Sequence, residues 1–436
     1  METSAEPALR VASWPGCPSR LLGERPGQAR ENYPAYQEQG GYLPLRDPSE
    51  LLAEVEASGL QGRGGAAFPL AVKLRAVRDN GRLTGGFGGS AVVANGEEGE
   101  PASVKDRWLL RNRPHLVLDG LRLAAAMVAA DRAYVYMSDP ESARSVEAAL
   151  TERPFGDIAI ELHVVAAGYI AGEETAVTRA INGGPVKPTD KPPRPFQKGV
   201  GGLPTLVSNV ETLANLPYLQ RHGAAAFRSR GTSRSPGTFL VTLTGAGVPP
   251  GLYEIPHGLP FCELLALHGV SSERVQGALL GGYFAGLLNR TAALDATLDH
   301  ETLRGLGSGL GCGAIAILTD DCPVAVAASV LAYFDRENAG QCGSCFNGTA
   351  AMAAVAGALR DGVAGPDDLA RLRRWSVQLR GRGACATLDA ATNMAGTLLD
   401  QFPDVVARHL DNACAACAVK AFDAQRPYEV EAVTCA

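Results

Sequence analysis

The sequence predicts an α/β protein, with a doubly wound unit first and a helical bundle last. Three observations lead to this prediction. Short apolar runs alternate with helical patterns between residues 91 and 165, as strands and helices do around a parallel sheet. A β-rich run follows at 238–244. Beyond residue 322 the apolar spacing is helical, and most of the ten cysteines lie from Cys312 onward.

Length and composition narrow the class of protein. With 436 residues, of which 46% are hydrophobic, the chain can bury two or three cores. Its net charge of −6 gives no basic field that would recruit nucleic acid. No apolar run is long enough to cross a membrane, and the first residues lack the pattern of a secretion signal. We therefore expect a soluble cytoplasmic protein, with no direct membrane insertion and no nucleic-acid partner.

The first 41 residues are rich in Pro, Gly, Arg and Glu and show little periodicity. We expect them to form an irregular arm. The first predicted helix follows at 47–57, where apolar residues recur at helical spacing behind the N-cap candidate Asp47.

A glycine-rich stretch comes next. Gly59–Lys73 (GLQGRGGAAFPLAVK) combines four glycines with two cations, Arg63 and Lys73. Glycines let backbone N–H groups approach an anion, and the helix expected after Pro69 would favour an anion at its N-terminus. The stretch matches neither the dinucleotide-binding fingerprint nor the Walker loop. Taken alone, it is therefore slightly better explained as a surface loop before a helix.

Strands and helices then alternate. We expect strands at 91–94, 133–137 and 158–165, and helices at 115–130 and 141–151. Ligands of open α/β sheets lie at the carboxyl ends of the strands. Two polar runs fall at such ends, Asn95–Asp106 (NGEEGEPASVKD) and Gly168–Thr175 (GYIAGEET). From the residues alone, the first is better explained as a solvated acidic turn. The carboxylates of the second also suit a helix start.

A second, smaller unit follows a Pro-rich segment at 187–204 and a soft boundary at 223–236. It begins with the strand at 238–244. Beyond that strand we expect a helix at 261–267, an apolar run with a glycine turn at 275–282, and a glycine-rich turn with a strand at 303–318.

Helical segments at 324–334, 349–359, 367–379 and 390–410 predict a four-helix bundle near the end of the chain. Cys342 and Cys345 open the second helix, and Cys385 lies in the loop before the last. In a reducing compartment, paired cysteines more often bind metal than form disulfides. From spacing alone, an iron–sulfur loop, half of a zinc site and a redox pair remain open.

Four motifs in order, together with the cysteines, carry a resemblance. They are GRGGAAFP, NGEEGEPASVKD, GYIAGEET and, at Pro204–Asn215, PTLVSNVETLAN. From about Gly59 to His409 the chain resembles the flavin- and NADH-binding 51 kDa subunit of respiratory complex I and the related diaphorase subunits of hydrogenases and formate dehydrogenases. The resemblance implies an FMN/NADH-binding α/β domain at 42–225, a β-grasp domain of the soluble-ligand-binding type at 236–320, an iron–sulfur bundle at 322–411 and a tail at 412–436.

The same resemblance implies the function and the site. We expect electrons to pass from NAD(P)H through FMN to a [4Fe–4S] cluster held by Cys342, Cys345 and Cys385, and then to a ferredoxin-like or complex-I-type partner. No acid–base residue is required. The implied binding residues are Gly62, Arg63, Gly64, Gly65, Phe68, Lys73, Asn95, Glu97, Glu98, Glu100, Tyr169, Gly172, Glu173, Glu174, Lys191, Arg194, Ser208, Asn209 and Thr212.

The chain departs from the family pattern at both cofactor sites. Arg194 replaces an aromatic residue that stacks on NADH, and a second stacking aromatic is absent near Ala76. Ala339 replaces the first cluster cysteine, which leaves one iron open to water, Asp, His or a distant Cys and permits a [3Fe–4S] form. The distant candidates are Cys312, Cys322, Cys414 and Cys417. These departures keep an alternative open, a scaffold or relay subunit that has lost NADH oxidation. The tail, with Cys414, Cys417 and Cys435, is either a disordered end or a second metal site.

Overall fold

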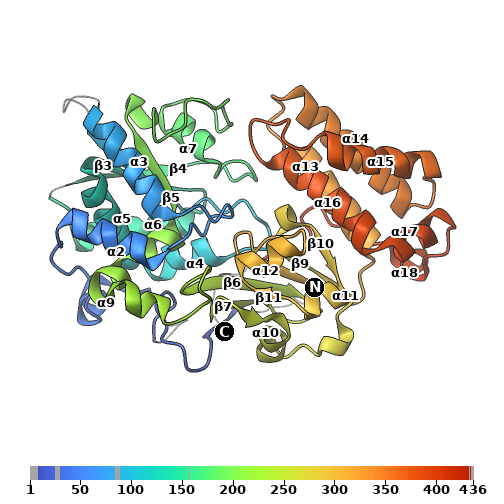
Figure 1. The fold of residues 1–436 in the computed structure, drawn as a ribbon, viewed down its shortest axis with the longest axis horizontal. Coiled ribbons are helices and arrows are strands. Elements are labelled where there is room, and N and C mark those ends of the chain that lie inside the picture. The colour runs from blue at the N-terminus through green and yellow to red at the C-terminus, as the bar shows by residue number, and fades with distance from the viewer. Residues whose placement is uncertain (1–7, 25–29, 84–88, 157, 432, 434–436) are drawn as a thin grey trace, which may run out of the picture.

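The structure is a computed structural model that describes residues 8–24, 30–83, 89–156, 158–431 and 433. Three parts follow one another along the chain (Figure 1): a parallel α/β unit, a mixed sheet with short helices, and a helical bundle. This arrangement confirms the predicted fold class. The domain borders given above remain predictions.

The α/β unit is built on a four-stranded parallel sheet in the order β4-β3-β2-β5. Its strands are β2 (Ser90–Asn95), β3 (Ala130–Met137), β4 (Ala159–Val164) and β5 (Thr205–Asn209). The chain adds β3 and β4 on one side of β2 and then returns to place β5 on the other side. This reversal puts a topological switch point between β2 and β5, where ligands of doubly wound sheets bind.

Helices pack around this sheet. α5 (Pro114–Val128) is buried along nearly its whole length because almost all its residues are apolar, and it packs on β2 and β3. α2 begins behind Asp47, whose carboxylate accepts from the N–H groups of Ser49 and Glu50. Besides α5, the helices of this unit are α2 (Pro48–Ser58), α3 (Leu70–Leu83), α4 (Lys105–Asn112), α6 (Pro140–Glu152), α7 (Glu174–Ile181), η1 (Val200–Gly202), α8 (Val210–Ala214) and α9 (Leu216–Arg228).

The second unit is a six-stranded mixed sheet in the order β1-β7-β6-β12-β9-β10. Its core contains Phe239, Leu264 and Ile315, all nearly inaccessible to solvent. The elements are β6 (Thr238–Gly245), β7 (Gly251–Pro256), β8 (Leu259–Pro260), α10 (Phe261–His268), η2 (Ser272–Arg274), β9 (Gly277–Leu280), η3 (Tyr283–Ala285), β10 (Leu287–Asn289), α11 (Arg290–Leu294), β11 (Thr297–Leu298), α12 (His300–Gly305) and β12 (Ala314–Leu318).

The N-terminal arm is more regular than we expected. β1 (Arg10–Ser13) pairs in parallel with β7 and so extends the mixed sheet. α1 (Tyr33–Glu38) packs on α5, where the Tyr36 hydroxyl donates to Asp119 at 2.9 Å. The expectation of an irregular arm is therefore wrong for these two segments, because their partners lie far along the chain and leave no local signal.

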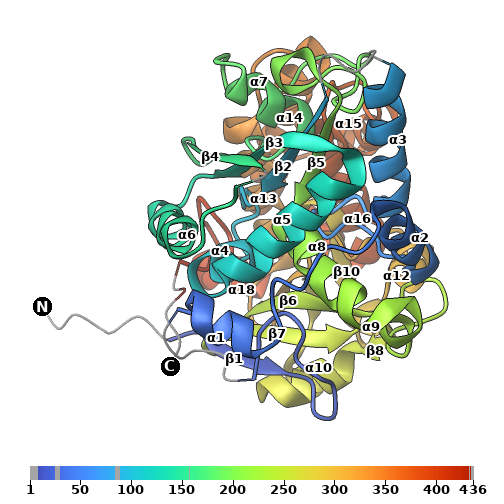
Figure 2. The same cartoon turned by 90° about the vertical axis from the view of Figure 1, so that its left-hand side faces the viewer.

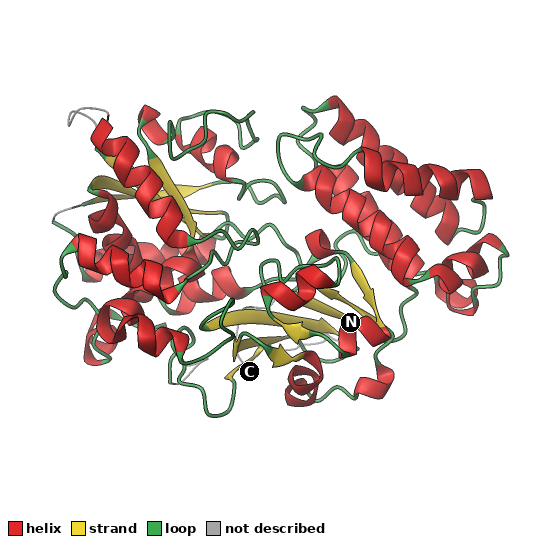
Figure 3. Ribbon diagram, in the orientation of Figure 1, coloured by secondary structure: helices red, strands yellow, loops and turns green. Residues whose placement is uncertain are grey.

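The bundle contains α13 (Pro323–Glu337), α14 (Gly343–Arg360), α15 (Pro366–Gln378), α16 (Thr387–Gln401) and α17 (Pro403–Leu410). It lies beside the α/β unit, with the mixed sheet below both (Figure 3). The helix expected at 390–410 is two helices, because Pro403 lacks the N–H needed to continue α16 and instead occupies the first position of α17.

The tail after the bundle forms α18 (Ala415–Lys420) and then returns to the α/β unit. Tyr428 donates to Asp321 at 2.8 Å, and the Val430 N–H donates to the Pro101 carbonyl at 3.0 Å. Both described valines of the tail end, Val430 and Val433, are buried against the α/β core. Figure 2 shows β1 beside β7 in the mixed sheet. Among the described residues, no helix is both long and apolar enough to cross a membrane.

Candidate cofactor site

The candidate site is centred on the ends of β2 and β5, at the switch point of the sheet. The last residues of these strands, Asn95 and Asn209, lie opposite each other in the sheet register. The Asn95 amide donates to the Gly172 carbonyl at 2.8 Å, which brings the Gly168–Thr175 loop to the same place. The Asn209 amide donates to Asp106 at 2.7 Å. Three of the four sequence motifs therefore meet here.

The glycine-rich stretch supplies the fourth. A Cβ on Gly64 would lie 3.3 Å from the Asn209 Cβ, so the loop packs directly over the end of β5. Gly62 donates to the Phe68 carbonyl at 2.9 Å and closes the loop. Gly65 has a φ of +116°, which L side chains rarely adopt, and a Cβ there would meet nothing within 4 Å. The exposed backbone at Gly64 and Gly65 is therefore open to a ligand.

Arg63 does not point into this opening. Its guanidinium is buried, donates to the Thr238 carbonyl at 3.2 Å and lies 3.8 Å from Glu211. Burial lowers the pKa of Arg63 to about 10, although the negative charge of Glu211 acts to raise it. The Arg63 N–H donates to Thr212 at 2.8 Å. Arg63 and Thr212 thus position the loop from beneath, and the cofactor contact that the resemblance implies for them stays a prediction.

Lys73 is the cation of this stretch that remains near solvent. Its ammonium donates to the Val207 carbonyl of β5 at 3.2 Å and pairs with Glu174 at 3.4 Å. Glu174 also pairs with Arg194 at 3.3 Å. These contacts place Lys73, Glu174 and Arg194 at the mouth of the site.

In the acidic run, Glu97 and Glu100 each have one buried oxygen without a hydrogen-bond partner among the described residues, whereas Glu98 is held by hydrogen bonds to α4. Glu97 accepts from the Gly168 N–H at 3.3 Å, and its other oxygen is buried with no hydrogen-bond partner among the described residues. Burial raises its pKa. Glu98 instead accepts from the Asp106 and Arg107 N–H groups at 3.1 Å each, and so caps α4. A buried carboxylate oxygen without a hydrogen-bond partner costs free energy. The unpaired oxygen of Glu97 therefore fits a ligand that donates a hydrogen bond to it.

Glu100 and Tyr169 lie at the junctions between units. Glu100 accepts from the Tyr283 N–H of the mixed sheet at 3.0 Å. The Tyr169 ring packs edge-on against Tyr333 and Phe334 of α13, with centroids 5.7 and 5.2 Å away. A Cβ on Gly99 would lie 2.7 Å from the Tyr169 carbonyl, so the two loops are in close contact. Tyr169 thus packs on aromatic residues of the bundle, and the cofactor contact that the resemblance implies for it stays a prediction.

The remaining expected residues line or support the site. Glu173 caps α7 by accepting from the Thr175 and Ala176 N–H groups, and its other oxygen pairs with Lys191. The Phe68 side chain is 47% exposed, which leaves its ring available for stacking. Ser208 is buried on β5.

Sequence reasoning missed a buried ionic group under the site, formed by Lys105, Asp106 and Glu211. The Lys105 ammonium lies 2.7 Å from Asp106 and 3.0 Å from Glu211, all three almost fully buried. Burial acts to lower the Lys105 pKa, but the two carboxylates raise it above its ordinary value. Lys105 therefore stays charged. The adjacent Lys105 and Asp106 were the signal that the sequence offered for this group. They end the polar run that follows the buried strand β2, where charged side chains are expected near a ligand site.

The cysteine triad, which consists of Cys342, Cys345 and Cys385, lies at the end of α13 nearest the α/β unit. Cys342 caps α14, Cys345 lies in its first turn, and the Ala384 N–H beside Cys385 donates to the Cys342 sulfur at 3.4 Å. Burial, then the charges of Cys385, Cys342 and Asp389, raise the Cys345 pKa to about 12. Binding of iron would favour the thiolate forms that such a setting otherwise disfavours. The residues present therefore fit a cluster with three protein thiolates.

The triad loop touches the cofactor site directly. Gln341 donates to the Pro188 carbonyl at 2.8 Å, and Lys187 donates to the Ala339 carbonyl at 2.8 Å. The Tyr169 N–H donates to Glu337 at the end of α13 at 3.3 Å. The two predicted centres are thus joined by direct contacts across 168–188.

Three of the four distant cysteines that could supply the fourth ligand lie far from the triad, at the other end of α13. Cys322 begins α13, whereas the triad lies beyond its other end. α13 has 15 residues, so it spans about 22 Å at the usual rise. Cys414 and Cys417 cluster with Cys322. Cys312 lies beside the acidic run, where burial, followed by the charge of Glu100, raises its pKa to about 12. Cys435 lies outside the described residues.

Comparison with known proteins agrees with this geometry. Over 400 residues the chain is 31% identical to the second F-type subunit of the NADH-quinone oxidoreductase of Rhizobium meliloti (strain 1021), covering 86% of this chain and 94% of that protein. The chain belongs to the family of NADH-quinone oxidoreductase F-type subunits. Residues 55–218 match the family model described as the Nuo51 FMN-binding domain, and residues 325–409 match the NADH-ubiquinone oxidoreductase-F iron-sulfur binding region.

Two further proteins support the assignment to the F-type family. The chain is 33% identical over 360 residues to the mitochondrial NADH dehydrogenase [ubiquinone] flavoprotein 1 of Dictyostelium discoideum, covering 78% of this chain and 74% of that protein. A solved NAD+-reducing [NiFe]-hydrogenase in its H2-reduced state superposes with a TM-score of 0.76 at 30% identity. That match covers 84% of this chain and 63% of the hydrogenase chain.

Proposed function

We propose that this chain is the flavoprotein subunit of an NADH-dehydrogenase-type (diaphorase) complex. It passes electrons from NAD(P)H through FMN to an iron–sulfur cluster and on to a protein partner. The observation that carries the proposal is the hydrogen bond from Gln341, beside Cys342, to Pro188 in the Pro-rich segment that also carries Lys191 and Arg194. Bound FMN would supply the change from hydride transfer to single-electron steps.

The FMN site that we propose uses the open backbone of Gly64 and Gly65 and the charge of Lys73. Asn95 and Asn209 lie on neighbouring strand ends, where they can orient polar edges of a ring system. The ionic group of Lys105, Asp106 and Glu211 holds Asn209 from below, with the Lys105 ammonium 3.4 Å from its side-chain oxygen. These residues bind and position; none has to move a proton.

The nicotinamide side of the site is proposed to include Phe68, Glu97 and the Glu173–Lys191 pair. Phe68 offers an exposed ring face. Arg194 offers a cation 3.3 Å from Glu174, where it can pair with a phosphate of the nucleotide. Because Arg194 suits an extra phosphate, NADPH should be tested beside NADH.

The cluster is proposed to be bound by Cys342, Cys345 and Cys385. Ala339 provides no thiolate. Asp389 lies in the first turn of α16, four residues after Cys385, and only one of its oxygens accepts from the Gly381 N–H, so its carboxylate is the fourth ligand that we favour over water. A site with three thiolates should lose the fourth iron readily in air.

The partner is proposed to be another electron-transfer subunit, either ferredoxin-like or of the complex I type. The relatives' names describe subunits of larger enzymes. We also propose the cytoplasm as the compartment, because none of the described cysteines forms a disulfide, which is the state that a reducing compartment maintains.

The test is a visible spectrum of protein purified without oxygen, before and after addition of NADH or NADPH. We expect flavin absorbance that bleaches with nucleotide, followed by a cluster signal in EPR. A protein with no flavin that also fails to take up FMN would contradict the proposal. A flavoprotein that neither nucleotide bleaches would instead support the scaffold alternative, which the comparisons do not favour. Unchanged bleaching rates for both nucleotides in Arg194→Ala would remove Arg194 from the site.

A further inference from the structure

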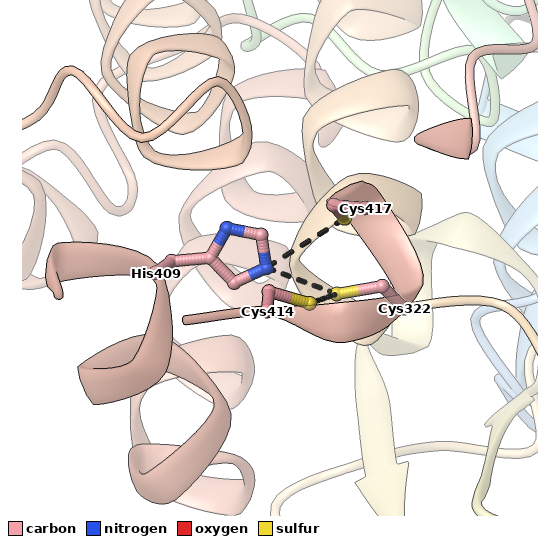
Figure 4. A group of neighbouring side chains, drawn as sticks. All are labelled: Cys322, His409, Cys414 and Cys417. Carbon is pink, nitrogen blue, oxygen red and sulfur yellow. Dashed lines mark hydrogen bonds between the residues drawn. The ribbon is translucent and has the colours of Figure 1, made fainter. Parts of the chain in front are cut away.

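A second group of metal-ligating side chains lies at the opposite end of α13 from the triad (Figure 4). The ligand atoms of Cys322, His409, Cys414 and Cys417 all lie within 4.8 Å of one another. The Cys322 and Cys414 sulfurs are 3.8 Å apart, and the His409 Nε2 is 3.1 Å from Cys322 and 3.8 Å from Cys417. Four ligands around one tetrahedral Zn²⁺, with Zn–S near 2.3 Å, are spaced by about 3.8 Å.

The protein holds these ligands in place from three helices. Cys322 is the buried N-cap residue of α13, and Cys414 and Cys417 lie at the start of α18. His409, 2% exposed, lies in the last turn of α17, and its Nδ1 lies 3.0 Å from the Leu359 carbonyl. A proton on Nδ1 donated to that carbonyl leaves the Nε2 lone pair facing the sulfurs, which is how metal-binding histidines are commonly oriented.

We propose that Cys322, His409, Cys414 and Cys417 bind a single structural Zn²⁺. Three thiolates and one imidazole form a closed tetrahedral set, which is typical of structural zinc and leaves no position for a substrate. Their spacing suits one ion. The ligands of an iron–sulfur cluster bind different iron atoms and need not be so close. This site is independent of the proposed electron-transfer function, because none of its residues belongs to the triad.

The position of the ion explains what it would do. It would fasten the end of α17 and the start of α18 to the point where the chain passes from β12 into α13. From α18 the tail continues to the acidic run, where Arg107 donates to the Val430 carbonyl at 2.8 Å. The zinc ion would therefore fix the tail across the bundle and against the cofactor-binding unit.

The test measures zinc and iron by mass spectrometry in full-length protein purified without oxygen. We expect one zinc per chain in the wild type. Cys417→Ser should lose that zinc but keep its iron and flavin. The matched variant Cys342→Ser should lose iron but keep its zinc and flavin. Cys262→Ser, which replaces an exposed cysteine outside both groups, should keep both metals.

Two further measurements keep the proposal testable if Cys417→Ser does not fold. His409→Cys should retain stoichiometric zinc through four thiolates, whereas His409→Ala should bind it at least tenfold more weakly. Cobalt exchanged into the wild type should give the visible spectrum of a tetrahedral thiolate complex. Wild-type protein without zinc, or loss of several iron atoms from Cys417→Ser, would overturn the proposal.

Discussion

Arg63 and Lys73 share one glycine-rich stretch but have opposite environments. Arg63 is 5% exposed and turned towards Glu211 and Thr238, whereas the Lys73 side chain is 32% exposed at the mouth of the site. Sequence could identify both as cations near an anion-binding loop. It could not give the direction of Arg63, because Glu211 lies far along the chain and faces it only after β5 pairs with β2.

This difference predicts separate effects of the two substitutions. Arg63→Ala should lower the free energy of unfolding by about 2 kcal/mol, because it removes a buried charged donor to the Thr238 carbonyl, while Lys105 still pairs with Glu211. Lys73→Ala should change stability by less than about 0.5 kcal/mol but weaken FMN binding roughly tenfold through loss of a charge-assisted contact. Urea unfolding of the apoprotein and flavin-fluorescence titration separate the two. Equal losses of stability would contradict the assignment.

Glu100 predicts a pH dependence. Burial raises its pKa to about 8, although the Tyr283 and Ala102 N–H groups oppose the shift. Since the folded pKa exceeds the ordinary 4.5, its contribution to stability is fully present below about pH 4.5. It is lost as pH rises towards 8, at about 1.4 kcal/mol per pKa unit. Glu100→Gln should therefore raise the unfolding midpoint at pH 9 and leave it nearly unchanged at pH 4. A gain of equal size at both pH values would exclude titration of Glu100 as the cause.

At the scale of elements, local pattern predicted most helices and strands of the α/β unit and the bundle. Apolar runs predicted β2 and β3, and the N-cap candidate Asp47 predicted the start of α2. Two features were not predictable in this way. β1 has four residues in a Pro- and Gly-rich arm, and its pairing partner β7 begins at Gly251. The Cys/His group joins residues of α13, α17 and α18, so only the folded bundle brings its ligands together.

The loop before α14 leads to a prediction about the cluster. The Ala339 carbonyl is held by Lys187 at 2.8 Å, so the loop keeps a fixed position although its cysteine is missing. Ala339→Cys should make the cluster resist air, because a fourth thiolate would hold the iron that is otherwise labile. EPR and iron content before and after air exposure measure this. Unchanged lability would mean that the fourth position is filled from elsewhere, and Asp389→Ala would then be the next variant.

At the scale of the whole molecule, Tyr169 links the two proposed redox centres. Its ring packs on Phe334 of the bundle while its backbone contacts the acidic run. Tyr169→Ala should slow reduction of the cluster without slowing bleaching of the flavin, because it loosens the contact that sets their separation. Tyr169→Phe, which keeps the ring, is the matched control. Stopped-flow absorbance with freeze-quench EPR distinguishes the two steps, and equal slowing of both would argue against this role.

β1 also has a protective consequence. In the mixed sheet it covers β7, whose residues are almost all buried and whose backbone would otherwise be an open edge able to pair with another chain. β1 itself is short and is followed closely by Pro15, which makes it a poor template for further strands. A chain lacking residues 1–13 should therefore self-associate on warming, whereas one lacking only residues 1–7, which keeps β1, should not. Light scattering during a thermal ramp would reveal the difference, and identical traces would show that β7 needs no such cover against aggregation.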